Sequence, residues 1–223
     1  VKRDGIGLPK PSLTGEDGSV VKVTAGGSAT LGDTELDDCP LTVKATAGGI
    51  EIGKLTADNG SNISLTAGGA ISTAKVSLTK STLTATTSGG PITLGNVTAA
   101  EGSDIMLDAS EGITAGDIDL DDSPLRAAAH SSSSAIALGD VTAENESDVM
   151  LEASAIGAGD MLLSESKLTA KAMGGGATFG SVTAPTHSDI LIEAKGSIAM
   201  GDISLTGNPL TAKSQDGGVA AGK

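Results

Sequence analysis

Histidine is the side chain best suited to acid–base or metal chemistry near neutral pH, and the chain has two, His130 and His187. Both lie in polar segments, Ala-Ala-Ala-His-Ser and Pro-Thr-His-Ser-Asp, without a second His or Cys at zinc-ligand spacing. Nucleophilic catalysis requires a base beside one particular Ser or Cys, and serine is too frequent here for the sequence to single one out. The sequence therefore predicts no catalytic residue and no zinc site, and we expect a protein that is not an enzyme.

Three aspartates recur after glycine, at Asp117, Asp140 and Asp160. Carboxylate oxygens at a regular spacing are the ligands that Ca²⁺ prefers, so these three are the candidate metal ligands of the sequence. An aspartate in a turn also commonly hydrogen-bonds the backbone of its own turn. Because the Gly-Gly-x-Gly-x-Asp calcium repeat does not occur, we favour the turn interpretation and expect no cofactor.

Cys39 is the only cysteine, so an internal disulfide is excluded. It stands where other repeats have serine, which differs by one atom, and we expect a substitution in a turn. The glycine-rich segment at residues 173–180 lacks the Lys-Ser/Thr pair of a phosphate-binding loop and is expected to form a corner. Four asparagines stand in N-x-S/T sequences and are candidate glycosylation sites: Asn59, Asn62, Asn96 and Asn145.

Composition excludes several classes of partner. The 223 residues include 28 acidic and 14 basic side chains, giving a net charge of −14, and only one aromatic residue, Phe179. Nucleic-acid binding normally needs a basic surface and, for single strands, aromatic platforms. No apolar run approaches 18 residues, so we expect neither a transmembrane helix nor membrane insertion.

The chain is a tandem repeat with a period of about 42 residues, made of two similar halves of about 21. The first half begins at Ile50 and again at Ile92, and the second half begins at Ile71 and again at Ile113. Five double repeats run from about residue 5 to residue 218, and residues 219–223 begin a further one. We therefore treat residues 1–223 as one rod rather than as several domains.

Each half-repeat has the alternating apolar pattern of half-buried strands, bounded by Gly, Ser, Asn and Asp. A unit of this size cannot bury its apolar face alone and must stack on its neighbours. The sequence thus predicts an all-β, single-stranded parallel β-solenoid of about ten coils that alternate between two types. We expect Ile, Leu and Val inside, Ala at the corners, and Gly at corners that need a positive φ.

Stacking also predicts columns of outward residues. Glu152, Lys171, Glu193 and Lys213 fall in one column of alternating charge. Thr56, Thr98, Thr142 and Thr183 recur in another column, but Ser77, Asp119, Leu162 and Ser204 stand between them. A threonine column with a charge in it is a poor flat face for ice.

The two ends of the chain resemble incomplete repeats. Ile6, Leu8 and Leu13 match Ile50, Ile52 and Leu55, while Val219 and Ala221 match Ile50 and Ile52 of the same unit. These are the candidate assembly ends, because an uncovered coil exposes strand edges to another chain. We expect either a homopolymer that stacks head to tail or the continuation of a longer chain.

The repeats at residues 90–99 (GPITLGNVTA), 103–109 (SDIMLDA) and 113–125 (ITAGDIDLDDSPL) resemble the shafts of bacterial filamentous haemagglutinin-like proteins. Those are secreted β-helical adhesins of the two-partner secretion type. The resemblance implies an extracellular or cell-surface location in a prokaryote. It also implies a non-catalytic structural role in a fibre, filament, sheath or adhesin shaft. The alternative is a module that binds a surface, either ice or a cell.

Overall fold

The computed structural model describes residues 11–222, which form strands and turns and contain no helix. The strands make two parallel sheets. Sheet 1 has 17 strands: β1 (Leu13–Gly15), β3 (Ala29–Leu31), β4 (Thr34–Asp37), β6 (Ile50–Asp58), β8 (Ile71–Thr79), β10 (Ile92–Ala100), β12 (Ile113–Ala115), β13 (Ile118–Asp121), β15 (Ala135–Leu138), β16 (Val141–Glu144), β18 (Ala155–Ala158), β19 (Met161–Ser164), β21 (Ala177–Phe179), β22 (Val182–Thr186), β24 (Ile198–Met200), β25 (Ile203–Leu205) and β27 (Val219–Ala221).

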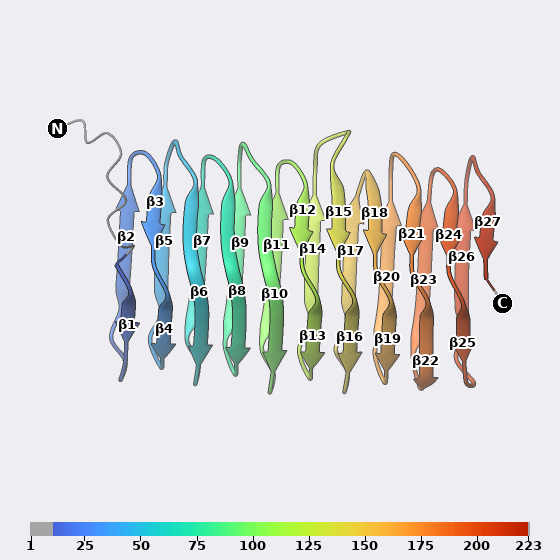
Figure 1. The fold of residues 1–223 in the computed structure, drawn as a ribbon, viewed down its shortest axis with the longest axis horizontal. Helices are drawn as coiled ribbons and strands as arrows, with labels where there is room; N and C mark the ends of the chain where they lie inside the picture. The colour runs from blue at the N-terminus through green and yellow to red at the C-terminus, as the bar shows by residue number, and fades with distance from the viewer. Residues whose placement is uncertain (1–10, 223) are drawn as a thin grey trace.

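Sheet 2 has ten strands, one from each coil. They are β2 (Val21–Ala25), β5 (Leu41–Ala45), β7 (Asn62–Ala67), β9 (Thr82–Thr87), β11 (Asp104–Ala109), β14 (Leu125–Ala129), β17 (Val149–Ala153), β20 (Lys167–Ala172), β23 (Asp189–Ala194) and β26 (Leu210–Ser214). Each coil crosses sheet 1, turns, and returns through sheet 2 in the opposite direction (Figure 1).

Equivalent residues of neighbouring coils lie opposite one another, which confirms the predicted β-solenoid of about ten coils. Leu94 lies opposite Ala115, for example, and Ala115 lies opposite Leu138. Ten coils at the usual strand spacing of about 4.8 Å make a stack on the order of 48 Å long. Figure 1 shows the coils side by side from one end of the described chain to the other.

The space between the two sheets is filled by aliphatic side chains. One column runs through Ile50, Ile71, Ile92, Ile113 and Ile136, all at most 1% exposed. The predicted corner alanines are buried at the end of sheet 2 strands: Ala45, Ala67, Ala109, Ala129, Ala153, Ala172 and Ala194. The single aromatic ring, Phe179, stacks between Ala158 and Met200. One neighbour is small and the other is flexible, so together they leave room for the ring.

The expected role of glycine is wrong for most of the repeat. Ten non-glycine residues have a positive φ, whereas only Gly18, Gly60, Gly102 and Gly207 do so among the described glycines. The recurring glycine of each coil is needed instead for a close approach. A Cβ on Gly139 would lie 2.4 Å from Asp117 Oδ1 of the preceding coil, which is too close for any other residue without a rearrangement.

A ladder of buried serines joins the turns between sheet 1 and sheet 2, and the sequence did not reveal it. The backbone N–H of Ser103 donates to Ser123 Oγ at 3.2 Å, and the N–H of Ser123 donates to Ser147 Oγ at 2.9 Å. Ser123 Oγ in turn donates to the Asp121 carbonyl at 2.9 Å. The remaining members are Ser61, Ser81, Ser166, Ser188 and, at the end, Asn208.

Cys39 occupies the first position of this serine ladder. It lies in the turn between β4 and β5, as expected, and its side chain is fully buried. The backbone N–H of Cys39 donates to Ser61 Oγ at 3.0 Å, as a serine there would do. The thiol therefore occupies the place of a ladder hydroxyl.

Replacing Ser123 with alanine should destabilise the fold, because the buried N–H of Ser103 loses its acceptor. The expected loss in the free energy of unfolding is about 1–3 kcal/mol, measured by chemical denaturation followed by circular dichroism. Ser133→Ala is the matched control, since Ser133 is exposed in a turn. Equal midpoints for the two variants would show that the serine ladder carries no stability.

Candidate functional site

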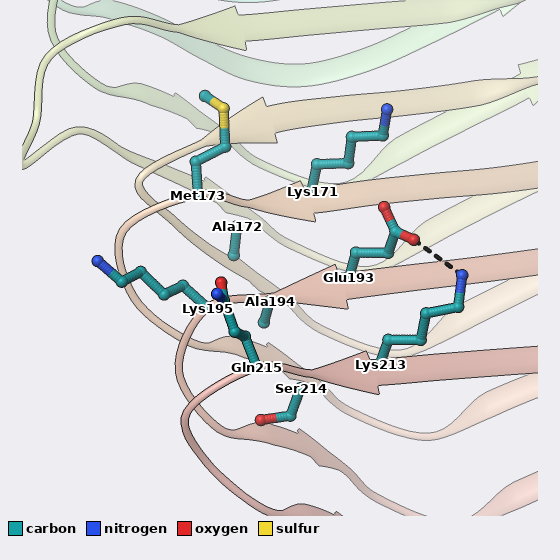
Figure 2. Close-up of a pocket in the computed structure, with 9 residues that line it drawn as sticks. All are labelled: Lys171, Ala172, Met173, Glu193, Ala194, Lys195, Lys213, Ser214 and Gln215. Carbon is teal, nitrogen blue, oxygen red and sulfur yellow. Dashed lines mark hydrogen bonds and ion pairs between the residues drawn. The ribbon is translucent and has the colours of Figure 1, made fainter.

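The outer face of sheet 2 carries the column of alternating charge in the predicted register. Glu152 lies opposite Lys171, Lys171 opposite Glu193, and Glu193 opposite Lys213. The ammonium of Lys213 lies 3.1 Å from Glu193 Oε1 (Figure 2). The side chains are 64% and 38% exposed, so this ion pair contributes little on its own.

A surface hollow of about 390 Å³ lies around this ion pair. Figure 2 shows Ala172 and Ala194 between the longer side chains of the hollow, with Met173, Lys195 and Gln215 towards the turns. Within residues 11–222, Lys171 and Lys195 make no ion pair. The hollow therefore contains two cations that form no ion pair in the described chain, although Lys171 lies between Glu152 and Glu193 in the charge column.

A second hollow, of about 190 Å³, lies further along the same face. Arg126 stands there between Met106 and Met150 of the neighbouring coils. Ala128 interrupts the charge column between Asp108 and Glu152. Asp108 instead meets His130, whose Nε2 lies 2.8 Å from Asp108 Oδ1.

The methionines divide between the core and this face. Met161 and Met200 are buried, whereas Met106, Met150 and Met173 are 44%, 45% and 54% exposed. The two exposed methionines that lie within strands, Met106 and Met150, point outward from sheet 2, and Met173 follows β20 of the same sheet. Sheet 2 thus combines exposed apolar groups with unpaired cations.

The aspartates Asp117, Asp140 and Asp160 do form a column, but they do not cap their own turns as expected. Asp117 Oδ1 accepts the backbone N–H of Asp140 at 3.2 Å, and Asp140 Oδ1 accepts that of Asp160 at 2.8 Å. Asp160 Oδ1 accepts the N–H of Ser181 at 2.7 Å. Each carboxylate therefore bonds the next coil, because the coil spacing brings the backbone N–H of that coil within hydrogen-bond distance.

Metal ligation at these aspartates is the alternative that the sequence favours less, and it stays untested. In the described part of the chain, no group of three or more His, Cys, Asp or Glu side chains is arranged to hold a metal ion. The two histidines are not brought together either. His130 follows a strand of sheet 2 and His187 follows a strand of sheet 1, at opposite edges of the coil.

The four sequon asparagines are all exposed, and each already makes a hydrogen bond. Asn59 donates to Asp37 Oδ1 at 2.6 Å and Asn145 donates to Asp121 Oδ1 at 2.5 Å. The other two asparagines accept hydrogen bonds through Oδ1. Asn62 accepts one from the hydroxyl of Thr82, and Asn96 accepts one from the backbone N–H of Asp117. Glycosylation at these positions remains a prediction of the sequence.

The candidate assembly ends are placed only in part. Leu13 pairs with Thr34, which in turn pairs with Leu55, so Leu13 stands in the column that the repeat predicts. Val219 and Ala221 belong to β27, which pairs with β24. Ile6 and Leu8 lie outside the described residues.

Comparison of the chain with protein-family models, with curated proteins and with solved structures finds no match. The likeness to haemagglutinin shafts thus stays a resemblance of sequence pattern. Among residues 11–222, there is no helix with the length and apolar character needed to span a bilayer.

Each charged residue of the column should stabilise the fold through the opposite charge in the neighbouring coil. A double-mutant cycle with Glu193→Gln and Lys213→Gln should give a coupling energy of about 0.2–1 kcal/mol that falls as salt is added. Ala128→Lys, which restores a cation between Asp108 and Glu152, should raise the unfolding midpoint. Ala128→Gln is the control for side-chain length, and an equal effect of Lys and Gln would exclude the electrostatic explanation.

Proposed function

We propose that this chain is the shaft of an extracellular structural fibre, such as a filament, sheath or adhesin stalk, and that it is not an enzyme. The observation that carries the proposal is the register of coil on coil from Leu13 to Ala221, which shifts only between Leu162 and Ser164 within the described residues. Such a stack extends in one dimension, and each coil contacts only its neighbours. Length can therefore be added by repetition without changing the interior.

The terminal coils support this proposal. Val21 and Val23 in the first described coil, and Ile203, Leu205 and Leu210 in the last, are only partly buried although they point inward. A further coil stacked on either end would bury them and pair the exposed strand edges. That coil would belong either to a second copy of the chain, which gives a homopolymer, or to a continuation of the same polypeptide.

The localisation is tested on the cells that produce the protein. Gold-labelled antibodies against residues 11–222 should decorate extended structures outside intact, unpermeabilised cells in electron micrographs. Antibodies against a cytoplasmic protein of the same cells are the control for leakage. Label found only after permeabilisation would contradict the proposal.

A second candidate function, binding to a flat surface, is supported by an array of hydroxyls that sequence reasoning missed. On sheet 2, Ser64 and Thr66 lie opposite Thr84 and Thr86, and Thr42 lies opposite Ser64 on the other side. The threonine column of sheet 1 is in the register expected, with Asp119 and Leu162 among its members. The four hydroxyls of β7 and β9 have no charge among them, although Lys44 lies opposite Thr66 and Asp108 opposite Thr86, so this array is the better candidate for a regular surface such as ice.

Ice binding by this array would produce thermal hysteresis in a solution of the protein. If the hydroxyls bind ice, Thr66→Lys should abolish the hysteresis, because a long charged side chain breaks the flat array. Thr183→Lys on sheet 1 is the matched control. A solution that freezes and melts at one temperature would exclude ice as the surface.

A further inference from the structure

Two exposed methionines stand on either side of an arginine on the outer face of sheet 2. Met106 of β11 lies opposite Arg126 of β14, and Arg126 lies opposite Met150 of β17. All three side chains point outward, and all three line the hollow of about 190 Å³. Each methionine is therefore separated from the same arginine by one strand spacing, about 4.8 Å between backbones.

A threonine continues this column on each side. Thr84 lies opposite Met106 and Thr169 lies opposite Met150, so each methionine has a hydroxyl in one neighbouring coil and the guanidinium in the other. Within residues 11–222, neither hydroxyl makes a hydrogen bond, and the guanidinium of Arg126 makes no ion pair. A thioether sulfur is only a weak acceptor, so the three donors of this column lack a strong acceptor within it.

Two carboxylates border the same hollow, Asp108 and Glu152. Asp108 Oδ1 lies 2.8 Å from Nε2 of His130, and Glu152 lies opposite Lys171 in the charge column. In the described chain neither carboxylate forms an ion pair with Arg126. Both stand two residues further along their strands, whereas the methionines lie directly opposite the arginine. A strong acceptor on either methionine would therefore have the guanidinium as its nearest cation in the column.

We propose that Met106 and Met150 are sites of oxidation to the sulfoxide by hydrogen peroxide, and that Arg126 and the neighbouring threonine hydroxyls bind the sulfoxide oxygens. The sulfur lone pair attacks one peroxide oxygen, an S–O bond forms as the O–O bond breaks, and water leaves. The sulfur loses two electrons and the peroxide gains them. Oxidation replaces a weak acceptor with a polar oxygen, and this oxygen has a donor in each neighbouring coil.

The position of these methionines determines what oxidation does to the fold. Met161 and Met200 are buried in the core, where a polar sulfoxide would be costly. Met106 and Met150 face solvent, so their oxidation removes no apolar group from the core. Each hydrogen bond that the sulfoxide accepts joins two successive coils. Oxidation at this column should therefore stabilise the stack, although methionine oxidation in a core disrupts it.

The inference is tested by treating the folded protein with hydrogen peroxide and locating the added oxygen by peptide mass spectrometry. Met106 and Met150 should each gain one oxygen about tenfold faster than Met161 and Met200, because the buried sulfurs are reached only when the stack opens. After removal of the peroxide, the midpoint of chemical denaturation should be higher than in the untreated protein. Treatment with the two methionine sulfoxide reductases, one for each epimer, should reverse the rise.

Variants separate the arginine from the other effects of oxidation. Arg126→Leu removes the shared donor, so oxidation should raise the midpoint much less than in the unmodified sequence. Arg126→Lys keeps a cationic donor and should restore part of the rise. Met173→Leu is the matched control, because Met173 is exposed in the turn after β20 and lies outside this column. This variant should keep the full rise, whereas Met106→Leu with Met150→Leu should lose it.

Each outcome decides for or against the inference. A rise that depends on both methionines and on Arg126 supports it. A midpoint that falls or stays the same once Met106 and Met150 carry oxygen overturns it, and so does an equal rise in Arg126→Leu. Oxidation of Met161 and Met200 as fast as of the exposed pair would also overturn it. None of these results affects the shaft proposal, which depends on where the protein is found.

Discussion

The contact between equivalent residues of successive coils is the constraint on which the rest of this structure depends. A coil buries its apolar residues only by resting on the coils before and after it, so each position along the coil is also a column along the rod. The side chain at each position must therefore pack against the side chain at the same position one coil away. Ile stacks on Ile, Ala on Ala, and the buried serines on one another. The scarcity of aromatic residues has the same cause, since a ring must be accommodated by its neighbours in the column.

Polar groups are satisfied by the same rule. In the buried ladder, the Oγ of every serine except Ser81 accepts a backbone N–H from the preceding coil, and the column aspartates accept one from the following coil. These side chains extend the hydrogen-bonding of the sheets through the turns, where strand pairing ends. A buried N–H without an acceptor costs more than a hydrogen bond contributes, so these bonds help to hold the turns in register. Each coil is thereby hydrogen-bonded to the coils before and after it, in the turns as well as in the strands.

The surface reflects a second consequence of stacking. One residue per coil becomes a row of residues along the rod, and a small bias in composition at one position becomes a charged edge or face. The turns between sheet 1 and sheet 2 are rich in Asp and Asn because these residues tolerate the positive φ found there. The alternating charges of Glu193 and its neighbours show the opposite solution, in which like charges are kept two coils apart. The two arrangements give the rod distinct sides.

The sequence by itself determined the period, the inward positions and the register of the outward columns. Each of these follows from residues repeated along the chain, so Leu13, Glu193 and Ala194 are found in the columns expected of them. Only the tertiary structure decided which group each polar side chain meets. Asp117 was expected to bond its own turn and bonds the next coil, and Gly139 makes room for that carboxylate rather than supplying a positive φ. The reason is physical: these partners are separated by one coil along the chain but by one strand spacing in space, and that distance is set by the stack.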